Sequence, residues 1–397
     1  MSSFFVVFDT CTHAAYYGDV HQVLALPEGA VIRYEYKRRL FKADAAAEID
    51  RLTTHSSELP LPVLLMYGEK HGFKHGDDDP ADMLRVADSR FIPTRSAELV
   101  AVAVDRGAQR SEDVLYLHLR LKGFVRPDIP AVQKLVIALE AVNSLPFGDR
   151  ASQYTWISLL PAALATNAGQ LTSEDQEAWP AVVDRFVDGP TQFKDDVFWR
   201  VRGVFEEKSG APANEVRLVD RSTNARVHAD RYRRDYQLHE SKRYLVTVQT
   251  HSPEAHGATV PAGSSVAMTS ADDDQGLLKL AADPMQLVPN QTASKRFSIS
   301  TDSSIDVRFT GINLETQVPN QVDKYPAGSM CSLTFSVRKQ RWRLALGIIQ
   351  ILASTAIGGY IAGAKPTDWT AAALPAVALL LFGVGGWFLT QQFKLGK

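Results

Sequence analysis

Two long uncharged runs dominate the C-terminal part of the chain. The first extends from Leu344 to Ala364 and the second from Trp369 to Phe393, with the polar turn Lys365–Asp368 between them. A helix of about 20 residues spans roughly 30 Å, the thickness of the hydrocarbon core of a bilayer. The pattern predicts a hairpin of two transmembrane helices over residues 341–397. The alternative is a helical hairpin buried in a soluble core, which two adjacent uncharged runs of this length disfavour.

Cations cluster at the two outer ends of this pair of runs, which a hairpin brings to the same side of a membrane. They are Arg338, Lys339, Arg341 and Arg343 before the first run, and Lys394 and Lys397 after the second. In the connecting turn, Lys365 is balanced by Asp368. By the positive-inside rule we expect a multi-pass protein of the cell inner membrane with both termini in the cytoplasm.

Small and polar residues in the first run are candidates for helix contacts. They are Gln350, Ser354, Gly358, Gly359 and Gly363, and the last two form a GxxxG motif. Small residues let helix backbones approach closely in lipid, and a polar side chain in mid-span favours a partner or a water-filled lumen. Three interpretations stay open: packing within the hairpin, contact between subunits, and a pore lined by Gln350.

The first part of the chain, residues 1–145, shows a mixed pattern. Short apolar or alternating segments predict strands at Phe4–Asp9, His21–Leu26, Val31–Tyr36, Pro62–Tyr67, Glu98–Val104 and Val114–Phe124. Helical periodicity predicts helices at Ala43–His55 and Ala131–Asn143. In Val114–Phe124 the leucines alternate with polar residues, a pattern typical of a half-buried strand. We therefore predict a mixed β/α N-terminal domain.

The pattern changes twice before the uncharged runs. Residues 146–195 contain a small apolar stretch and an acidic, helix-like stretch, and we interpret them as a helical connector. Residues 196–340 then alternate between short strand patterns and turn residues, which favours a β-sandwich. The predicted fold class is thus an α+β, mostly β region followed by a two-helix transmembrane hairpin.

Composition narrows the function classes. The formal net charge of the 397 residues is −2, which gives no global electrostatic reason to expect nucleic-acid binding. The two cysteines, Cys11 and Cys331, are far apart, as in a protein of a reducing compartment. Met1–Asp9 lacks a basic start and a signal-length apolar core. We therefore expect the first ~340 residues to lie in the cytosol.

Basic and aromatic residues are interleaved in two stretches, Arg33–Arg39 and Arg226–Arg243. Guanidinium groups beside tyrosines suit phosphates and stacked bases, and they also suit anionic lipid headgroups. From the second stretch we take Arg231, Arg233, Arg234, Lys242 and Arg243 as candidate ligand- or phosphate-binding residues. The alternative is an exposed edge strand whose charges prevent aggregation.

Other candidate chemistry is sparse. His71, His75 and Asp77 lie in a glycine-rich stretch and are candidate metal ligands, although a solvated loop is the alternative. The sequence has no Walker A motif, no GxGxxG, no HExxH and no kinase loop set, so we expect no cofactor and no motif-defined enzyme.

The layout of soluble domains followed by two membrane helices resembles bacterial membrane effectors of immune or stress systems. The leading hypothesis is a sensor and effector in antiphage or stress defence. Its soluble domains bind a nucleotide-type ligand or a partner protein, and its hairpins form homo-oligomers that open a pore or disturb the membrane lipid. A membrane-tethered scaffold and an anchored enzyme with dispersed catalytic residues are the alternatives.

Overall fold

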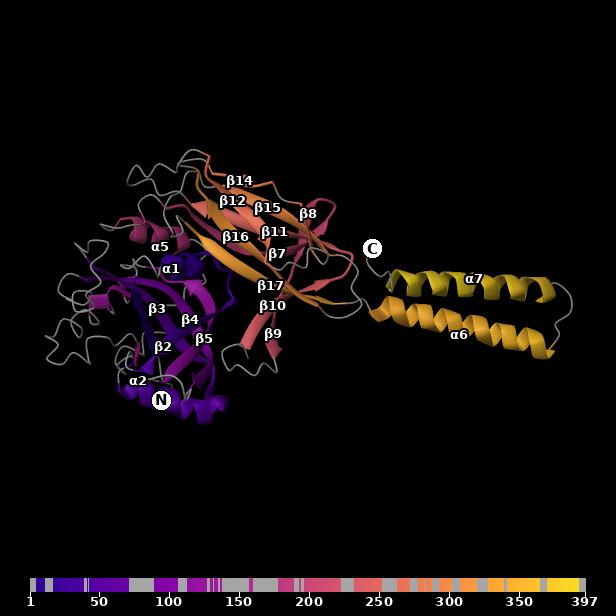
Figure 1. Ribbon diagram of the computed structural model, residues 1–397, viewed down its shortest axis with the longest axis horizontal. Helices are drawn as coiled ribbons and strands as arrows, with labels where there is room; N and C mark the ends of the chain where they lie inside the picture. Colours follow the sequence, from indigo (N-terminus) through magenta and orange to yellow (C-terminus); the bar gives the residue numbers. More distant parts are fainter. Residues whose placement is uncertain are drawn as a thin grey trace.

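The protein consists of a globular part and a long two-helix projection (Figure 1). The computed structural model describes residues 5–10, 17–38, 41, 43–70, 89–105, 113–126, 129–130, 132–134, 136–137, 157–159, 178–188, 193, 196–222, 232–251, 263–271, 278–281, 283–287, 293–301, 308–319, 328–338, 341–364 and 370–392. Within these residues the prediction of a mostly β fold, with a mixed N-terminal region and C-terminal helices, is confirmed.

The N-terminal unit is built on a six-stranded sheet of order β2-β5-β4-β3-β1-β6. Its strands are β1 (Phe5–Thr10), β2 (Val31–Lys37), β3 (Leu61–Lys70), β4 (Ser89–Asp105), β5 (Val114–Phe124) and β6 (Ile157–Leu159). Only β1 and β3 pair in parallel, and the other pairs are antiparallel. Helix α2 (Ala43–Thr54) packs against β4 and β6 and is followed by the short 3₁₀ turn η3 (Ser56–Glu58).

Strand β5 differs from the half-buried strand that its alternation predicts. Leu115, Leu117, Leu119 and Leu121 are buried as expected. Tyr116 and His118, on the opposite face, are buried as well. The alternation therefore places the strand correctly, but both faces of this part of the sheet are covered.

The segment His21–Leu26 was predicted as a strand, but His21–Ala25 lies in helix α1 (Tyr17–Ala25) and Leu26 directly follows it, so that prediction is wrong. The helix packs against β7 and β17 of the following sheets. Most of its side chains are buried, including Val20, His21 and Leu24. A helix that is enclosed on several sides has no continuous polar face. A short piece of its sequence therefore has the same apolar pattern as a buried strand.

The second part of the globular region consists of two sheets that pack face to face as a sandwich (Figure 1). One has the order β14-β12-β16-β17-β10-β9 and the other β13-β15-β11-β7-β8. The strands are β7 (Phe198–Lys208), β8 (Ala211–Glu215), β9 (Leu218–Ser222), β10 (Tyr232–His239), β11 (Arg243–His251), β12 (Ser265–Ser270), β13 (Leu278–Ala281), β14 (Met285–Gln286), β15 (Ser294–Thr301), β16 (Arg308–Gln317) and β17 (Met330–Arg338). Large side chains such as Trp199, Phe297 and Phe335 are fully buried, and Nε1 of Trp199 on β7 donates a hydrogen bond of 2.9 Å to Thr316 on β16 of the other sheet.

The N-terminal unit and the sandwich share one continuous hydrophobic cluster. Helix α5 (Ala178–Val187) contributes Trp179 and Phe186 to it. The expected helical connector, residues 146–195, thus contains α5 and also β6, which belongs to the N-terminal sheet. A single hydrophobic core therefore joins the two units.

Helices α6 (Arg341–Ala364) and α7 (Thr370–Gln392) form an antiparallel pair that projects from the globular part (Figure 1). The Ser354 hydroxyl donates a hydrogen bond of 2.7 Å to the carbonyl oxygen of Ala378. A Cβ atom added at Gly385 would lie 2.9 Å from the carbonyl oxygen of Gly347, so the two backbones approach closely there.

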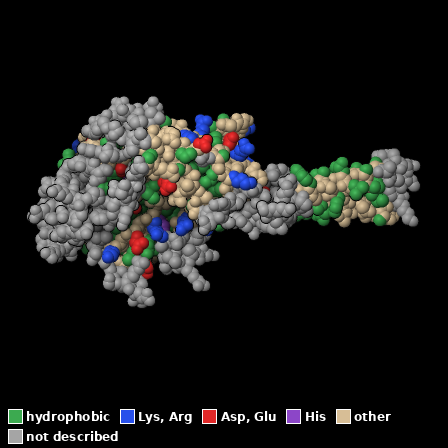
Figure 2. Space-filling view, turned by 45° about the horizontal axis from the view of Figure 1, so that its top comes forward, with side chains coloured by type: hydrophobic (Ala, Val, Ile, Leu, Met, Phe, Trp, Pro, Cys, Tyr) green, Lys and Arg blue, Asp and Glu red, His purple; other side chains and the backbone are tan. Residues whose placement is uncertain are grey.

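Large hydrophobic side chains point outward from this pair, among them Leu352 and Leu379. Figure 2 shows hydrophobic and uncharged side chains over the described hairpin, whereas charged side chains lie on the globular part. By length and composition, Ala345–Gly363 is the one helical segment of the described chain that is long and apolar enough to cross a membrane, with a mean hydropathy of 1.7. A shorter apolar segment, Ala373–Trp387, lies in α7.

Candidate ligand-binding pocket

A pocket of about 430 Å³ lies where the N-terminal unit meets the sandwich. We call it the arginine pocket. It is lined by Gln22, Leu26, Pro27, Ala30, Val31, Ile32, Arg33 and His118 from the N-terminal unit, and by Leu218, Tyr232, Arg233, Arg234, Tyr236, Ser332, Leu333 and Thr334 from the sandwich. The two basic stretches singled out in the sequence therefore converge on one site, because β2 and β10 lie on its opposite walls.

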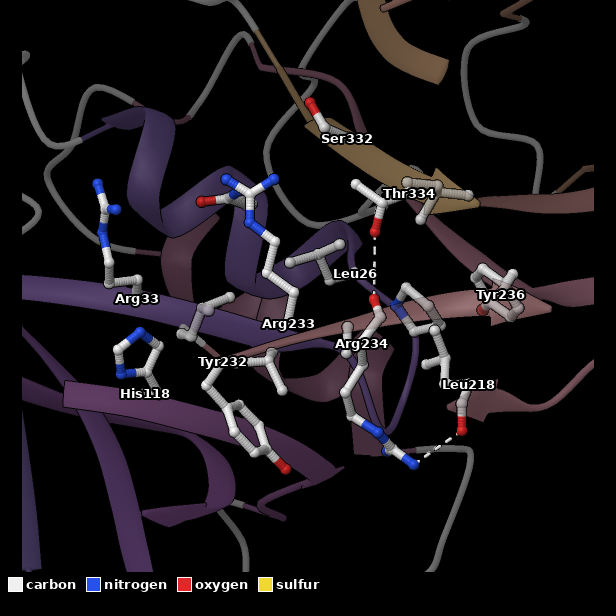
Figure 3. A pocket seen from close by; sticks show the side chains of 16 residues that line it. Leu26, Arg33, His118, Leu218, Tyr232, Arg233, Arg234, Tyr236, Ser332 and Thr334 are labelled. Atoms are coloured by element: carbon white, nitrogen blue, oxygen red, sulfur yellow. Dashed lines mark hydrogen bonds between the residues drawn. The ribbon is translucent and has the colours of Figure 1, made fainter. Parts of the chain in front are cut away.

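Positive charge dominates the arginine pocket. Arg33 of β2 is paired in register with His118 of β5, and both lie on one side of the space (Figure 3). Arg233 of β10 extends between them and Ser332 of β17 (Figure 3). Among the described residues, no aspartate or glutamate lines the pocket. Guanidinium groups gathered without carboxylates among the lining residues favour an anionic ligand, for which arginine offers paired hydrogen-bond donors.

Arg234 has a structural role at the base of the same pocket. Its Nη1 donates to the carbonyl oxygen of Gly29 at 2.9 Å, and its Nη2 donates to that of Leu218 at 2.8 Å. Its Nε lies 2.9 Å from the Asp220 carboxylate. The guanidinium thus points away from the pocket centre (Figure 3) and ties β10 to the turn before β2.

Gly29 is suited to this contact for two reasons. Its φ is +83°, in the left-handed region where residues with a Cβ atom are strained. A Cβ atom there would also lie 3.0 Å from Nη1 of Arg234. Glycine therefore allows the turn and the approach of the guanidinium at the same position.

Aromatic and hydroxyl groups complete the lining. The Tyr232 hydroxyl donates to Asp220 at 3.0 Å, and its ring lies 6.2 Å from that of His118. Burial raises the pKa of Tyr232 and of Tyr236, so both phenols are neutral hydrogen-bonding groups at neutral pH. Thr334 donates from its hydroxyl to the carbonyl oxygen of Arg234 at 3.1 Å. The pocket thus contains aromatic rings, hydroxyl groups and cations. These are the groups that bind the ring and the phosphate of a nucleotide-type ligand.

The other predicted ligand-binding residues lie elsewhere. Lys242 forms an ion pair with Glu206 on β7. Arg243 is exposed at the start of β11, and neither residue lines the arginine pocket. Arg231 lies outside the described residues. Of the five residues predicted, the structure therefore brings Arg233 and Arg234 together at the pocket.

The sequence reasoning missed His118, Ser332 and Thr334 as pocket residues. His118 lay within the recognised alternation of β5, but nothing local indicated that Tyr232 would cover it. Ser332 and Thr334 alternate on β17 without any motif. Their approach to Arg233 depends on the parallel pairing of β10 with β17, a contact between segments about 100 residues apart.

The predicted metal ligands His71, His75 and Asp77 lie outside the described residues. Within the part of the chain that the structure describes, no group of three or more His, Cys, Asp or Glu side chains is arranged to hold a metal ion. Cys331 is buried, and burial raises the pKa of its thiol, so it is a poor nucleophile at neutral pH.

The candidate membrane-contact residues fall into two groups, those that lie against α7 and those that are exposed. Ser354 contacts α7, and Gln350 lies beside the close approach of Gly385. Gly358, Gly359 and Gly363 are exposed, and an added Cβ atom at any of them would meet no atom of the described residues within 4 Å. Packing within the hairpin therefore involves Ser354 and the region of Gln350, and leaves the GxxxG face open.

Comparison with known proteins gives no family. No family model matches the sequence, and no curated relative matches it. Among solved structures, the cysteine protease inhibitor EhICP2 from Entamoeba histolytica is 18% identical, over 27% of this chain and 86% of its own, with a TM-score of 0.17. The secreted serine protease VesC from Vibrio cholerae is 10% identical, over 66% of this chain and 62% of its own, with a TM-score of 0.18. At these TM-scores neither similarity carries an argument about this protein.

Proposed function

We propose that this protein is a membrane-anchored sensor and effector. In this proposal the arginine pocket binds an anionic ligand of nucleotide type, and the hairpin acts on the membrane in response. The observation that carries it is the route of β17. Ser332 and Thr334 line the pocket, β17 ends at Arg338, and α6 begins at Arg341. In this proposal a change at the pocket wall is transmitted along β17 toward α6.

The chemistry of the pocket supports a nucleotide-type ligand. Its volume of about 430 Å³ falls in the range of roughly 300–1,000 Å³ that is usual for small-molecule sites. Arg33 and Arg233 would bind phosphate oxygens, and Tyr232 would provide a ring surface beside them. A charged lipid headgroup is a weaker fit, because the pocket lies between the two globular units and not at the start of α6.

The hairpin supports membrane insertion by both helices. Its outward residues are large and apolar, and the described part of α7 continues the apolar surface of α6. In the proposed topology both helices span the inner membrane and the globular part lies in the cytoplasm. The flanking cations favour this orientation.

The open GxxxG face supports assembly of several hairpins. At Gly358, Gly359 and Gly363 an added Cβ atom would meet no atom of the described residues, so we propose that these positions contact a helix of another copy. We propose that ligand binding favours this assembly and that the assembled hairpins open a pore or disturb the membrane. By analogy with the bacterial effectors that this layout resembles, we propose a role in defence or stress response.

The binding step is tested with full-length protein in detergent and a panel of nucleotides: AMP, ATP, cyclic AMP and cyclic di-AMP. We expect at least one to bind with a Kd that Arg233→Gln weakens by about 10-fold or more, since one charge-assisted hydrogen bond contributes about 1.5–3 kcal/mol. Arg243→Gln is the matched control, because it removes an exposed arginine outside the pocket. If none binds, or if both variants weaken binding equally, the arginine pocket is not a nucleotide site.

A further inference from the structure

The arginine pocket has two chemically different ends. Arg33, Arg233 and His118 lie toward one end, and Leu218 and Tyr236 lie toward the other (Figure 3). The first end carries the cations that the proposed function assigns to phosphate. The second end consists of an aliphatic side chain and a buried aromatic ring. A ligand that fits both ends has its anionic group at one end of the molecule and an apolar ring at the other.

The turn between α1 and β2 forms one wall of the pocket, and its backbone groups already take part in hydrogen bonds within the protein. The carbonyl oxygen of Pro27 accepts from the amide of Ala30 at 3.3 Å. The amide of Gly29 donates to Leu121 at 2.8 Å, and the carbonyl oxygen of Ala30 accepts from the amide of Leu121 at 2.8 Å. Pro27 itself has no amide hydrogen. This wall therefore meets a ligand mainly with carbon atoms.

The facing wall at the apolar end is engaged in the same way. The carbonyl oxygen of Leu218 accepts from Nη2 of Arg234 at 2.8 Å, and the carbonyl oxygen of Arg234 accepts from the Thr334 hydroxyl at 3.1 Å. The ring of Tyr236 is stacked on that of Phe335, with the ring centres 5.8 Å apart. The hydrogen-bonding groups here hold the walls together. A site that hydrogen-bonds its ligand rejects analogues strongly, whereas an apolar surface discriminates weakly between rings of similar size.

We propose that the ligand of the arginine pocket is a single nucleotide with a terminal phosphate group, and that the site tolerates different bases. The phosphate lies at Arg33 and Arg233, and the base lies toward Leu218. This inference rests on the proposed function, because it takes the arginine pocket to be a nucleotide site. It goes further by naming which nucleotides fit and which end of the pocket selects them.

A cyclic dinucleotide fits this arrangement less well. Its phosphates lie in the middle of the molecule with a base on either side. One base would therefore occupy the cationic end, where a single nucleotide places its phosphate. The pocket volume of about 430 Å³ also lies toward the lower end of the usual range of roughly 300–1,000 Å³ for small-molecule sites.

The test is isothermal titration of AMP, IMP, GMP, adenosine and cyclic di-AMP into full-length protein in detergent. We expect the affinities for AMP, IMP and GMP to agree within about 10-fold, because only the groups at the edge of the base differ. Adenosine should bind about 100-fold more weakly than AMP, since the contacts of two guanidinium groups with phosphate are lost. Cyclic di-AMP should bind at least about 10-fold more weakly than AMP, because one of its bases has no apolar surface to cover it.

A substitution at the apolar end adds an independent test. Leu218→Ala should weaken the binding of AMP, IMP and GMP by a similar factor of about 5, because each base loses the same apolar contact. Val219→Ala is the matched control. Val219 is the next residue of β9, is 36% exposed and does not line the pocket, so its truncation should leave all three affinities unchanged. If Leu218→Ala fails to fold, the comparison of ligands on the wild-type protein decides the result.

Three outcomes would overturn this inference and leave nucleotide binding at the arginine pocket standing. They are a preference of about 100-fold or more for one base, tighter binding of cyclic di-AMP than of AMP, and equal affinities for adenosine and AMP. A complete lack of nucleotide binding is a different result, because it would remove the proposed function together with this inference.

Discussion

The guanidinium of Arg234 donates a hydrogen bond of 2.9 Å to the carbonyl oxygen of Gly29, and so joins β10 of the sandwich to the turn before β2. The two residues are 205 positions apart in the chain. The contact lies at the base of the arginine pocket. It fixes the distance between the two walls that carry Arg33 and Arg233, so the geometry of the site depends on it.

Removing this contact should loosen the junction. We expect Arg234→Ala to lower the free energy of unfolding by about 1–3 kcal/mol, because buried carbonyl groups lose their donor. Gly29→Ala should cost a similar amount, since its φ of +83° is unfavourable for alanine. Urea unfolding of the two single variants and the double variant measures the coupling. Fully additive losses would show that the two residues act independently.

Arg33 allows a test of charge at the opposite wall. Arg33→Gln should weaken nucleotide binding by about 10-fold and reduce its dependence on salt, because one cation that faces the ligand is lost. Glu35→Gln is the matched control on the same exposed face of β2, two residues along, and it lies outside the pocket. Nucleotide affinities of the two variants, measured at low and at high salt, distinguish the loss of a pocket cation from the loss of a charge outside the pocket. An equal effect of both substitutions would point to a general surface effect.

The hairpin should tolerate substitution on one face and not on the other. Gly385→Leu should separate α6 from α7, because a Cβ atom there already lies 2.9 Å from the carbonyl oxygen of Gly347. Gly359→Leu should leave the hairpin intact and weaken association between copies, since an added Cβ atom there would meet no atom of the described residues within 4 Å. Disulfide cross-linking between cysteines placed in α6 and α7 reports the first effect. Mass photometry in detergent reports the second, and unchanged oligomers of Gly359→Leu would contradict the proposed interface.

Alkaline pH should destabilise the sandwich through Tyr244. Burial raises the pKa of this phenol to about 12 from an ordinary value of 10. The folded protein therefore keeps a proton that the unfolded chain loses, so its contribution to stability is complete below pH 10 and is lost as the pH rises through 12. Urea unfolding at pH 9 and pH 11 should show a smaller decline for Tyr244→Phe than for the wild type. Equal declines would mean that other groups cause the effect.

Sequence patterns predicted most strands and the two C-terminal helices better than they predicted the site, and of these helices α6 alone contains a segment long and apolar enough to cross a membrane within the described chain. Val114–Phe124 matches β5 end to end, because leucine alternation over a whole strand is a strong signal. The prediction of a strand at His21–Leu26 was wrong because α1 is enclosed on several sides and has no polar face. The uncharged runs correspond to α6 and α7 because length and composition suffice there.

The site itself was only partly predictable. Interleaved arginines and tyrosines indicated that Arg33 and Arg233 belonged to chemically similar stretches. Their meeting across one pocket depends on the packing of the N-terminal unit on the sandwich, which no local pattern contains. The separation of Arg233 from Lys242 has the same origin, since Lys242 pairs with Glu206 on a neighbouring strand.

Release of calcein from liposomes that contain the full-length protein tests most directly whether the arginine pocket controls the hairpin. The nucleotide that binds best in detergent is added to wild-type protein and to Arg233→Gln, with Arg243→Gln as the control. We predict release on addition of the nucleotide for the wild type and for Arg243→Gln, and a much reduced release for Arg233→Gln at the same concentration. Nucleotide binding without release, or equal release from all three proteins with and without nucleotide, would contradict the coupling of pocket to membrane and favour a tethered scaffold.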